Sequence, residues 1–338
     1  MMSAAVACDG QKVATGLNAE KKDWLVSLLG PRVQFDVPMW RHTTLAVGGP
    51  ADVLAMPADI KVLTMLLSGA RQRAIPWLIV GGGSNLLVRD GGIRGIVIAL
   101  TPYFKGITTI DPGPGDVRVT AKAGTRLKTL CRYAIEQGLA GMTFALGIPG
   151  SVGGAIAMNA GTADGCIGDV LETITVLWPT GRLQRLSRTD LDFGYRRLSL
   201  PTPEITIGQH QGVIIDGTFT FSQTDPRQLR VSVEKIQAER KQRQPGGVSS
   251  AGCFFKNPSS GPSAGELIDK AGLKGKRVGG AEISSRHGNF IINRGNACAA
   301  DILALAEIIE TRVAAKFGVQ LEPEVIIAGE SNHASKSV

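Results

Sequence analysis

The stretch GLAGMTFALGIPGSVGGAIAMNAG, residues 138–161, narrows the fold of this 338-residue chain more than any other. It holds seven Gly among 24 residues, separated by small apolar side chains, with Asn159 near its end. A backbone without Cβ atoms can approach a ligand closely and turn its N–H groups toward it. Because a loop this long and apolar is uncommon in a compact domain without a function, we expect it to lie flat against a large planar ligand. A Gly-rich connector is the alternative.

The first Gly-rich segment in chain order, VGGGSNLLVRDGG at 80–92, places three consecutive Gly after a predicted strand and before Ser84 and Asn85, and 138–161 is thus the second. Its backbone N–H groups, hydroxyl and amide suit an anion, whereas a tight turn between strands is the alternative. The spacing fits neither the Rossmann fingerprint nor a P-loop. Two such segments in one domain favour a dinucleotide held through its pyrophosphate.

Composition limits the possible partners. The net charge of +8 suggests an anionic one: nucleic acid, a membrane surface or a small phosphorylated substrate. An aromatic content of 5% without a basic–aromatic repeat argues against nucleic acid. No window approaches the ~18 apolar residues of a membrane span, and the N-terminus does not resemble a signal peptide. Five scattered Cys without a C-x-x-C pair predict neither disulfides nor a metal site, so we expect a cytoplasmic protein.

Short apolar runs alternate with helical patterns from residue 43 onward, which predicts an α+β fold. Strands are expected at 51–57, 76–80, 95–100, 117–124, 212–222, 289–293 and 324–329, with a hairpin at 173–187 around Pro179–Gly181. Helices are expected at 59–74, 127–138, 225–245, 263–272 and 299–318. We divide the chain into an N-terminal extension (1–36), a first unit (37–222) in two lobes that part near 100, a second unit (223–330) and a tail (331–338).

Polar residues outside the Gly segments supply the candidates for chemistry. Tyr195 and Arg196, in DFGYRRLSLP at 192–201, offer an aromatic face and a cation that can pair with a carboxylate or an enolate, although a solvated Arg is the simpler interpretation. Cys253, in SSAGCFFKNP at 249–258, can be a buried packing residue, a nucleophile or a proton donor, and no Cys–His triad can be written for it.

Four further residues complete these candidates. Lys256 and Asn257 suit a phosphate or carboxylate, while His287 and Asn289 are plausible ligands without a diagnostic context. Glu324 starts a strand that reads as buried, where a carboxyl group has a raised pKa; a surface Glu at a strand end is the alternative.

Taken in order, seven segments resemble one family, the UDP-N-acetylenolpyruvoylglucosamine reductases. They are HTTLAVGGPAD, GGGSNLLVRDGGIRG, GIPGSVGGAIAMNAG, FGYR, SSAGCFFKNP, HGNFIIN and LEPEV, between about residues 38 and 330. Each motif is weak alone, but their shared order makes chance a poor explanation. The resemblance implies a two-lobed FAD-binding unit of the vanillyl-alcohol-oxidase type, followed by a C-terminal α+β substrate-binding domain.

The resemblance also implies site residues. Arg196, Cys253 and Glu324 would be catalytic, and Tyr195, Lys256, Asn257, His287 and Asn289 would contact the substrate. FAD, held without a covalent bond, would contact Thr43, Thr44, Gly48, Gly49, Gly81, Gly82, Gly83, Ser84, Asn85, Gly147, Ile148, Pro149, Gly150, Ser151, Gly153, Gly154, Met158 and Asn159.

The implied reaction belongs to peptidoglycan precursor synthesis and hence to cell wall biogenesis. NADPH would reduce FAD, and the reduced flavin would pass hydride from N5 to UDP-N-acetylglucosamine enolpyruvate, giving UDP-N-acetylmuramate. Arg196 and a protonated Glu324 would stabilise the enolate. The family's usual proton donor is Ser, and this chain has Cys253 instead. A thiol, with an ordinary pKa of ~8.5, is a stronger acid than an alcohol. Arg196 and Lys256 nearby would favour the thiolate, but the apolar setting of Phe254 and Phe255 opposes this, so we expect Cys253 to serve as a neutral thiol.

Some features stay open to alternatives. The region between Arg196 and Gln244 is short for the inserted loop with a capping Tyr found in one branch of the family, which indicates the loop-less branch. The match around YRRLSLP is offset after Arg196, which leaves Ser199 an uncertain ligand. We expect a monomer that binds NADPH and the enolpyruvyl sugar nucleotide, with no nucleic acid or membrane insertion. An FAD oxidase of an alcohol or sugar, or a nucleotide-binding protein without catalysis, are the competing hypotheses.

Overall fold

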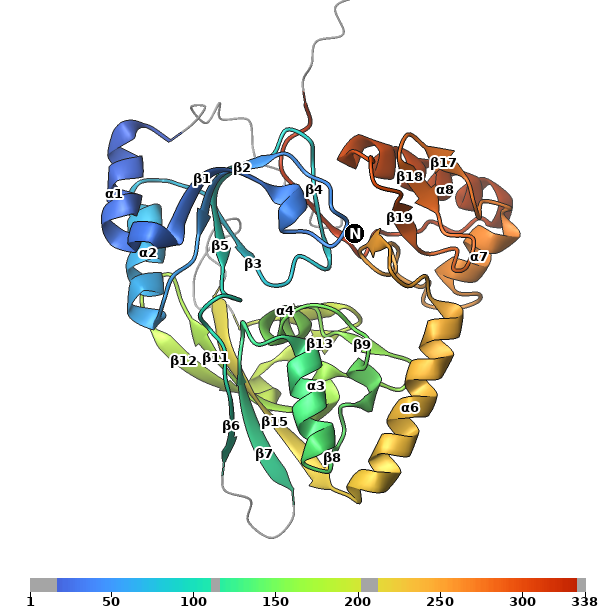
Figure 1. Cartoon of the computed structure of the whole chain (residues 1–338), viewed down its shortest axis with the longest axis horizontal. Coiled ribbons are helices and arrows are strands. Elements are labelled where there is room, and N and C mark those ends of the chain that lie inside the picture. The colour runs from blue at the N-terminus through green and yellow to red at the C-terminus, as the bar shows by residue number, and fades with distance from the viewer. Residues whose placement is uncertain (1–16, 111–115, 202–211, 333–338) are drawn as a thin grey trace, which may run out of the picture.

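The computed structural model describes residues 17–110, 116–201 and 212–332. Figure 1 shows three bodies: two lobes built from the first two thirds of the chain, and a C-terminal body (orange to red) beside the first lobe. Helix α6 (Pro226–Arg243) runs along the second lobe and leads into the C-terminal body. Among the described residues, no helix has the length and apolar composition to cross a membrane.

The first lobe contains a four-stranded sheet in the order β1-β2-β5-β3. Its parallel strands are the buried runs predicted at 51–57, 76–80 and 95–100, and helix α2 begins at Asp59, whose carboxylate caps the N–H of Val62. The remaining bounds are β2 Pro50–Ala55, α2 Ile60–Gln72, β3 Trp77–Val80, β4 Leu86–Val88 and β5 Ile93–Ala99.

The predicted N-terminal extension (1–36) overlaps with this lobe, because its later residues form a helix and most of a strand. Helix α1 (Ala19–Leu29) starts at the capping side chain of Asn18 and buries Leu25 and Leu29 in the same core as α2. Strand β1 (Val33–Pro38) pairs with β2 along its length. Part of the predicted extension is therefore structural, while residues 1–16 and the end of the predicted tail (333–338) lie outside the described residues.

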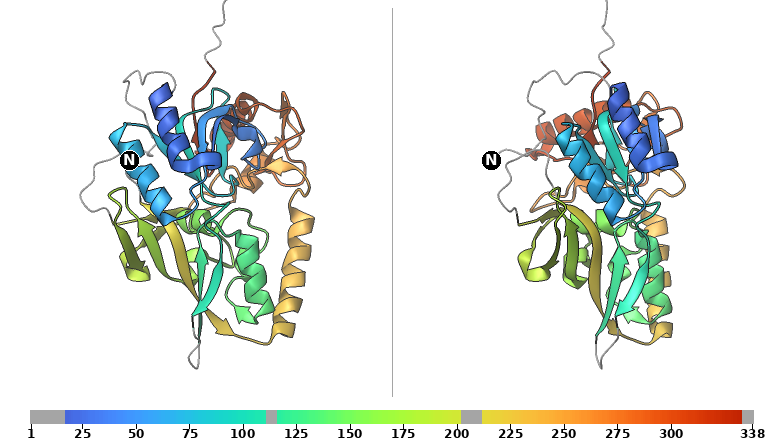
Figure 2. Two further views of the ribbon diagram at one scale, coloured as in Figure 1. Left: turned by 60° about the vertical axis from the view of Figure 1, so that its left-hand side comes forward. Right: turned by 90° about the vertical axis from the view of Figure 1, so that its left-hand side faces the viewer.

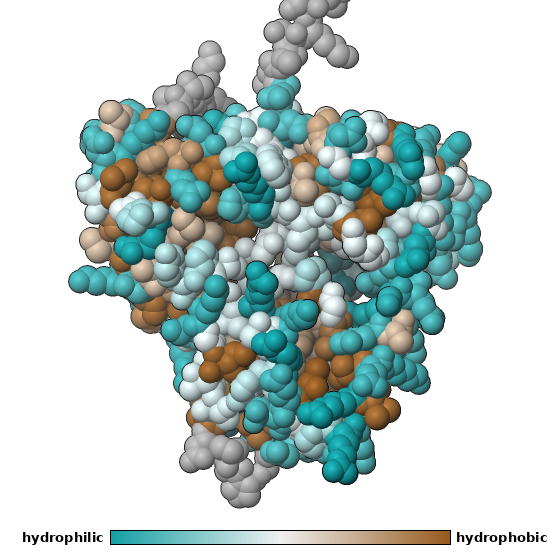
Figure 3. Space-filling model, in the orientation of Figure 1, coloured by the Kyte–Doolittle hydropathy of each residue, from teal (hydrophilic) through white to brown (hydrophobic). Residues whose placement is uncertain are grey.

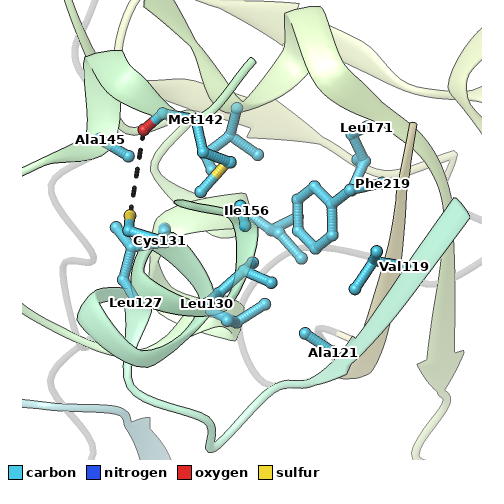
Figure 4. Packing of buried hydrophobic residues seen from close by; sticks show 14 of the residues in the cluster. Val119, Ala121, Leu127, Leu130, Cys131, Met142, Ala145, Ile156, Leu171 and Phe219 are labelled. Atoms are coloured by element: carbon cyan, nitrogen blue, oxygen red, sulfur yellow. Dashed lines mark hydrogen bonds between the residues drawn. The ribbon is translucent and has the colours of Figure 1, made fainter. Parts of the chain in front are cut away.

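The second lobe is an antiparallel sheet in the order β12-β11-β15-β7-β6, with α3 (Leu127–Glu136) and α4 (Val152–Ala157) packed on it. In its core, Ile156 of α4 lies beside Phe219 of β15 (Figure 4). The hairpin predicted around 179–181 is confirmed by the pairing of β11 and β12. The strands are β6 Ile107–Ile110, β7 Val117–Lys122, β8 Leu139–Ala140, β9 Gly161–Thr162, β10 Gly165–Cys166, β11 Leu171–Leu177, β12 Leu183–Ser187, β13 Asp192–Gly194, β14 Arg197–Ser199 and β15 Val213–Gln223, with helix α5 at Ile167–Val170.

The C-terminal body places α8 (Ala299–Phe317) and α7 (Ala264–Lys270) against a small sheet ordered β16-β19-β18-β17. Its strands are β16 Ser249–Ser250, β17 Arg277–Val278, β18 Ala281–Ile283 and β19 Ile291–Asn293. After α8 the chain returns to the first lobe, because β20 (Ile326–Ala328) pairs in parallel with β4.

Contacts also cross the predicted boundary at 222. Helix α6 buries Leu229 and Val233, and Val233 belongs to the core of the second lobe. The two views of Figure 2 agree that α6 lies along this lobe. The last third of the chain therefore contacts the second lobe through α6 and the first lobe through β20, which places its residues where the lobes meet.

Candidate active site

The two Gly-rich segments face each other between the lobes. A Cβ atom at Gly82 would lie 2.8 Å from the Cα of Gly150, and one at Gly81 would collide with the hydroxyl of Ser151. The hydroxyl of Ser84 donates to the carbonyl of Pro149 at 3.2 Å. The sequence predicted that both segments serve one ligand, and the fold brings them into contact.

This cradle fits a pyrophosphate. Gly83 has a φ of +62°, and its close approach to the His42 carbonyl leaves no room for a side chain. In the described part of the chain, the backbone N–H groups of Gly82–Asn85 donate to no protein acceptor. These donors are thus available to an anion. On the face shown in Figure 3, residues of intermediate hydropathy gather at the centre, where the surface is hollowed.

The other expected cofactor residues surround this cradle in different ways. The Thr44 N–H donates to the Gly83 carbonyl at 3.0 Å, and the Thr43 hydroxyl donates to the Val47 carbonyl at 3.0 Å. Ile148 packs on the core of the second lobe. Gly153 and Gly154 lie in the short helix α4, which Ser151 caps by accepting from the Gly154 N–H at 3.3 Å.

Gly48 and Gly49 have a packing explanation. A Cβ at Gly48 would lie 2.7 Å from the Cβ of Val88, and one at Gly49 would collide with the Asp90 carbonyl. The Gly49 N–H donates to the Arg89 carbonyl at 3.1 Å. Both glycines are therefore required by the approach of the 43–49 segment to β4 and its turn, and the geometry assigns them no ligand.

Arg240 was not predicted from the sequence. From α6, its Nη2 donates to the carbonyl of Phe144 at 2.9 Å, and a Cβ at Gly147 would lie 3.1 Å from its Nη1. This guanidinium thus holds the second Gly-rich segment from outside. A charged residue in a highly charged helix carries no sequence signal for such a role.

Arg196 lies at the tip of the hairpin of β13 and β14, where Tyr195 and Arg196 connect the paired residues Gly194 and Arg197. Its φ is +55°, a conformation that costs a non-Gly residue about 1–3 kcal/mol. Its Nε is 2.8 Å from the Oε1 of Glu324, and both side chains are largely buried. The N–H is not aligned on that oxygen, so the contact is an ion pair without an aligned hydrogen bond.

Cys253 and Glu324 come from two extended segments that lie antiparallel. The Glu324 N–H donates to the Phe254 carbonyl at 2.8 Å, the Lys256 N–H donates to the Glu322 carbonyl at 2.9 Å, and a bridge joins Phe255 to Pro323. This pairing brings the thiol to the carboxyl and, through the ion pair, to Arg196. The three residues expected to be catalytic are thus gathered from three distant parts of the sequence.

The protonation of the site follows from its burial. Burial and, to a smaller extent, the nearby Glu324 raise the pKa of the Cys253 thiol to about 11, against the lowering effects of Arg196 and Asn289. Burial also raises the pKa of the Glu324 carboxyl, against the lowering effect of Arg196. Both shifts have the direction expected from the sequence, namely toward the neutral acid.

The expected substrate residues lie around this trio. The Tyr195 ring stacks on the Arg196 guanidinium at 5.1 Å, and its hydroxyl accepts from the Asn257 N–H at 3.4 Å. The Lys256 ammonium lies 3.3 Å from a Glu322 oxygen. The side-chain oxygen (Oδ1) of Asn257 accepts from the first N–H of α7, at Ala264. Tyr195 and Lys256 are partly exposed beside the trio, where an anionic ligand can meet them.

His287 and Asn289, the last two residues expected to contact the substrate, both make hydrogen bonds within the protein. The Nδ1 of His287 accepts from the Asn289 N–H at 3.2 Å, and burial lowers the pKa of this imidazole. The amide of Asn289, only 2% exposed, donates to the Phe255 carbonyl and accepts from its N–H, at 2.8 and 2.9 Å. Those two bonds give Asn289 a structural role at the Cys253 segment, and the substrate contacts expected of His287 and Asn289 stay predictions.

Comparison with known proteins identifies the class of this site. A family model described as an FAD binding domain matches residues 51–187, and a second, described as the C-terminal domain of UDP-N-acetylenolpyruvoylglucosamine reductase, matches residues 244–328. With the cradle between the lobes, these matches define an FAD-dependent oxidoreductase whose fold is the two-lobed α+β unit predicted from the sequence.

Whole-chain relatives identify the family. UDP-N-acetylenolpyruvoylglucosamine reductase of Desulfosudis oleivorans is 49% identical over 316 residues, covering 91% of this chain and 98% of that protein. The enzyme of Heliobacterium modesticaldum is 42% identical, covering 87% and 90%. The crystal structure of the reductase from Thermus caldophilus superposes with a TM-score of 0.69 at 37% identity, covering 87% and 97%. The chain belongs to the UDP-N-acetylenolpyruvoylglucosamine reductase family, as its seven motifs indicated.

Proposed function

We propose that this protein reduces UDP-N-acetylglucosamine enolpyruvate to UDP-N-acetylmuramate with NADPH as the reductant, and that Arg196, Cys253 and Glu324 carry the chemistry. One observation carries the proposal: where the lobes meet, the Arg196 cation lies beside two acids, Cys253 and Glu324, whose pKa values are raised so that the neutral form is favoured. An enol ether reduction needs charge stabilisation and a proton, and these groups supply both.

The two Gly-rich segments would hold FAD, which would supply the hydride chemistry with NADPH as its reductant. When hydride reaches the methylene carbon of the enol ether, negative charge develops on the neighbouring carbon and its carboxylate. Arg196 is a fixed cation that stabilises this charge where it forms. Cys253 then donates its proton to the carbon, as a positioned general acid. Because the thiol pKa is raised to about 11, the proton is present throughout the neutral range.

The ion pair between Arg196 and Glu324 suggests how substrate prepares the site. A substrate carboxylate that takes the guanidinium leaves Glu324 without its cation, and burial then favours the protonated carboxyl. A protonated Glu324 can donate a hydrogen bond to the enolate. The partly exposed Lys256 is suited to the negative charge of the ligand.

The test begins with a flavin spectrum of the purified protein, followed by NADPH consumption that depends on the enolpyruvyl substrate. Stopped-flow measurements then separate the two half-reactions. Cys253→Ala should leave flavin reduction by NADPH within about twofold of the wild type while slowing reoxidation by the substrate at least about 100-fold. Cys253→Ser, which restores the residue usual in the family, is the matched control and should retain reoxidation.

Equal slowing of both half-reactions in Cys253→Ala would remove the proton-donor role. Rapid reaction of the reduced protein with oxygen, without oxidation by the enolpyruvyl substrate, would instead support an FAD oxidase.

A further inference from the structure

Each residue of the catalytic trio lies on a segment that an asparagine side chain binds through its amide. Asn289 bonds both backbone groups of Phe255, two residues after Cys253. Asn159 donates to the carbonyl of Gly194, two residues before Arg196. Asn85 donates to the carbonyl of Glu324 itself. Asn289 comes from the turn before β19, Asn159 from the end of the 138–161 segment, and Asn85 from the 80–92 segment, just before β4.

The segment of Cys253 has little regular structure of its own. It is paired with 322–324 on one side through a single bridge and a few backbone bonds. On the other side, the Asn289 carbonyl accepts from the Phe254 N–H at 2.8 Å while its side chain bonds Phe255. Asn289 thereby replaces the neighbouring strand that this segment lacks, and it is 2% exposed.

The hairpin of Arg196 is held in a similar way. It has only two strands, and its tip residue has an unfavourable positive φ. The Asn159 amide donates to the Gly194 carbonyl at 3.0 Å, and its oxygen accepts from the Gly168 N–H of α5 at 2.9 Å. The amide thus joins the hairpin to the helix that precedes β11, and it is 7% exposed.

Glu324 is held from the first lobe. The Asn85 amide donates to the Glu324 carbonyl at 3.0 Å, and the Asn85 carbonyl accepts from the Ile326 N–H at 3.0 Å. Its amide also lies 3.7 Å from the Sδ of Met158, in the second Gly-rich segment. Asn85 therefore connects both cofactor segments to the residue that pairs with Arg196.

We propose that Asn85, Asn159 and Asn289 are positioning residues that hold Glu324, Arg196 and Cys253 in register with one another. The inference rests on the proposed function for the roles of those three residues. A side-chain amide donates through its NH2 and accepts through its oxygen, so it can satisfy the N–H and the C=O of a buried backbone together. Asn85 and Asn159 bond backbone groups of the trio's segments, so their effect reaches the chemistry through placement, whereas Asn289 also hydrogen-bonds the Cys253 thiol and lowers its pKa.

Asn289→Leu and Asn159→Leu test the proposal, because leucine has a similar size and makes no hydrogen bond. The matched control is Asn293→Leu, on β19, four residues after Asn289. The Asn293 amide is 8% exposed and bonds the carbonyls of Leu45 and Ala46 and the N–H groups of Gly295 and Ala297, away from the trio. All three variants should lower the melting temperature by similar amounts.

Only the two test variants should change the ratio of the half-reactions. We expect their reoxidation by the enolpyruvyl substrate to slow about 100-fold, the cost of a misplacement of about 1 Å, with flavin reduction by NADPH within about twofold. A second readout needs no activity: iodoacetamide labelling of Cys253 near neutral pH, resolved by mass spectrometry, should be slower in Asn289→Leu than in the wild type and in Asn293→Leu, because this variant loses the amide that lowers the thiol pKa.

Asn289→Asp adds a pH signature. A protonated carboxyl can donate to the Phe255 carbonyl as the amide does, whereas a carboxylate cannot. Reoxidation in this variant should approach the wild-type rate as the pH falls and decrease as it rises, while flavin reduction follows the wild-type profile.

The outcomes separate the two proposals. If the wild type does not turn over the enolpyruvyl substrate, the proposed function fails, and the labelling rates still test the placement of Cys253. Equal half-reaction ratios and equal labelling rates in Asn289→Leu and Asn293→Leu would overturn the positioning role, as would an Asn289→Asp profile without pH dependence beyond that of the wild type.

Discussion

The raised pKa of Cys253 makes a quantitative prediction for its reactivity. Only the thiolate attacks iodoacetamide, so the labelling rate of a cysteine rises about tenfold per pH unit until the pH reaches its pKa. The pKa of Cys253 is raised from an ordinary 9.0 to about 11. At pH 8 its thiolate fraction should therefore be about 100-fold below that of an ordinary cysteine.

Two effects act on the rate in opposite directions. A more basic thiolate is a better nucleophile, and a Brønsted coefficient of about 0.45 over two pKa units makes each thiolate roughly eightfold more reactive. The net expectation is labelling about 10-fold slower than for an ordinary thiol at pH 8, before any effect of limited access. Because access scales the rate without moving its midpoint, the decisive observation is the pH at which the rate levels off.

The assay is site-resolved labelling of the folded protein between pH 6 and 10.5, with the denatured protein as the reference. We expect the rate at Cys253 to keep rising to the top of this range, while the reference levels off near pH 9. Glu324→Gln should move the midpoint downward, because the carboxylate raises the thiol pKa. Rapid labelling at pH 6, or a plateau at or below pH 9, would show that the site stabilises the thiolate and refute proton donation from a neutral thiol.

Three further changes test other parts of the structure. Gly82→Ala should lose bound flavin, measured by absorbance after gel filtration, because its Cβ would lie 2.8 Å from Gly150, whereas Gly246→Ala, with open space around it, should keep the flavin. Asp90→Ala should lower the free energy of chemical unfolding by about 1 kcal/mol, since its carboxylate accepts from the first two N–H groups of α8; an unchanged value would contradict this cap. Glu282→Gln should lower the unfolding free energy by about 2 kcal/mol at pH 7, because two arginines bond this buried carboxylate. The pKa of Glu282 is lowered in the folded state, so this difference should disappear as the pH falls below about 4; a constant difference would exclude the carboxylate as its source.

The sequence predicts best where a residue type has few alternatives. Consecutive glycines in the two long segments predicted a cradle, and the structure places Gly82 against Gly150. Helix α1 was missed because only Leu25 and Leu29 are buried in it, which leaves a faint apolar pattern among its charges. The order of the motifs indicated the family, and the family resemblance pointed to Arg196, Cys253 and Glu324. These residues are too far apart in the sequence for any local spacing to connect them.

The asparagines show where such prediction ends. An Asn in a ligand-binding motif predicts an amide near the site, but not whether that amide meets the ligand or the backbone. Asn159 and Asn289 were expected to contact ligands, and both use their amides on backbone groups. The partner of a side-chain amide depends on segments that only the tertiary structure brings together.

The path of the C-terminal segment determines which part of the protein positions Glu324. Glu324 belongs by sequence to the C-terminal unit, yet β20 pairs with β4 and the Asn85 amide holds its carbonyl, so the first lobe sets its position. Arg196 comes from the second lobe and Cys253 from the C-terminal body. The ion pair between Arg196 and Glu324 therefore joins the two lobes across the cofactor cradle. A substrate carboxylate that pairs with Arg196 would break this ion pair as Glu324 becomes protonated. Substrate binding would thereby couple the charge of the site to the contact between the lobes.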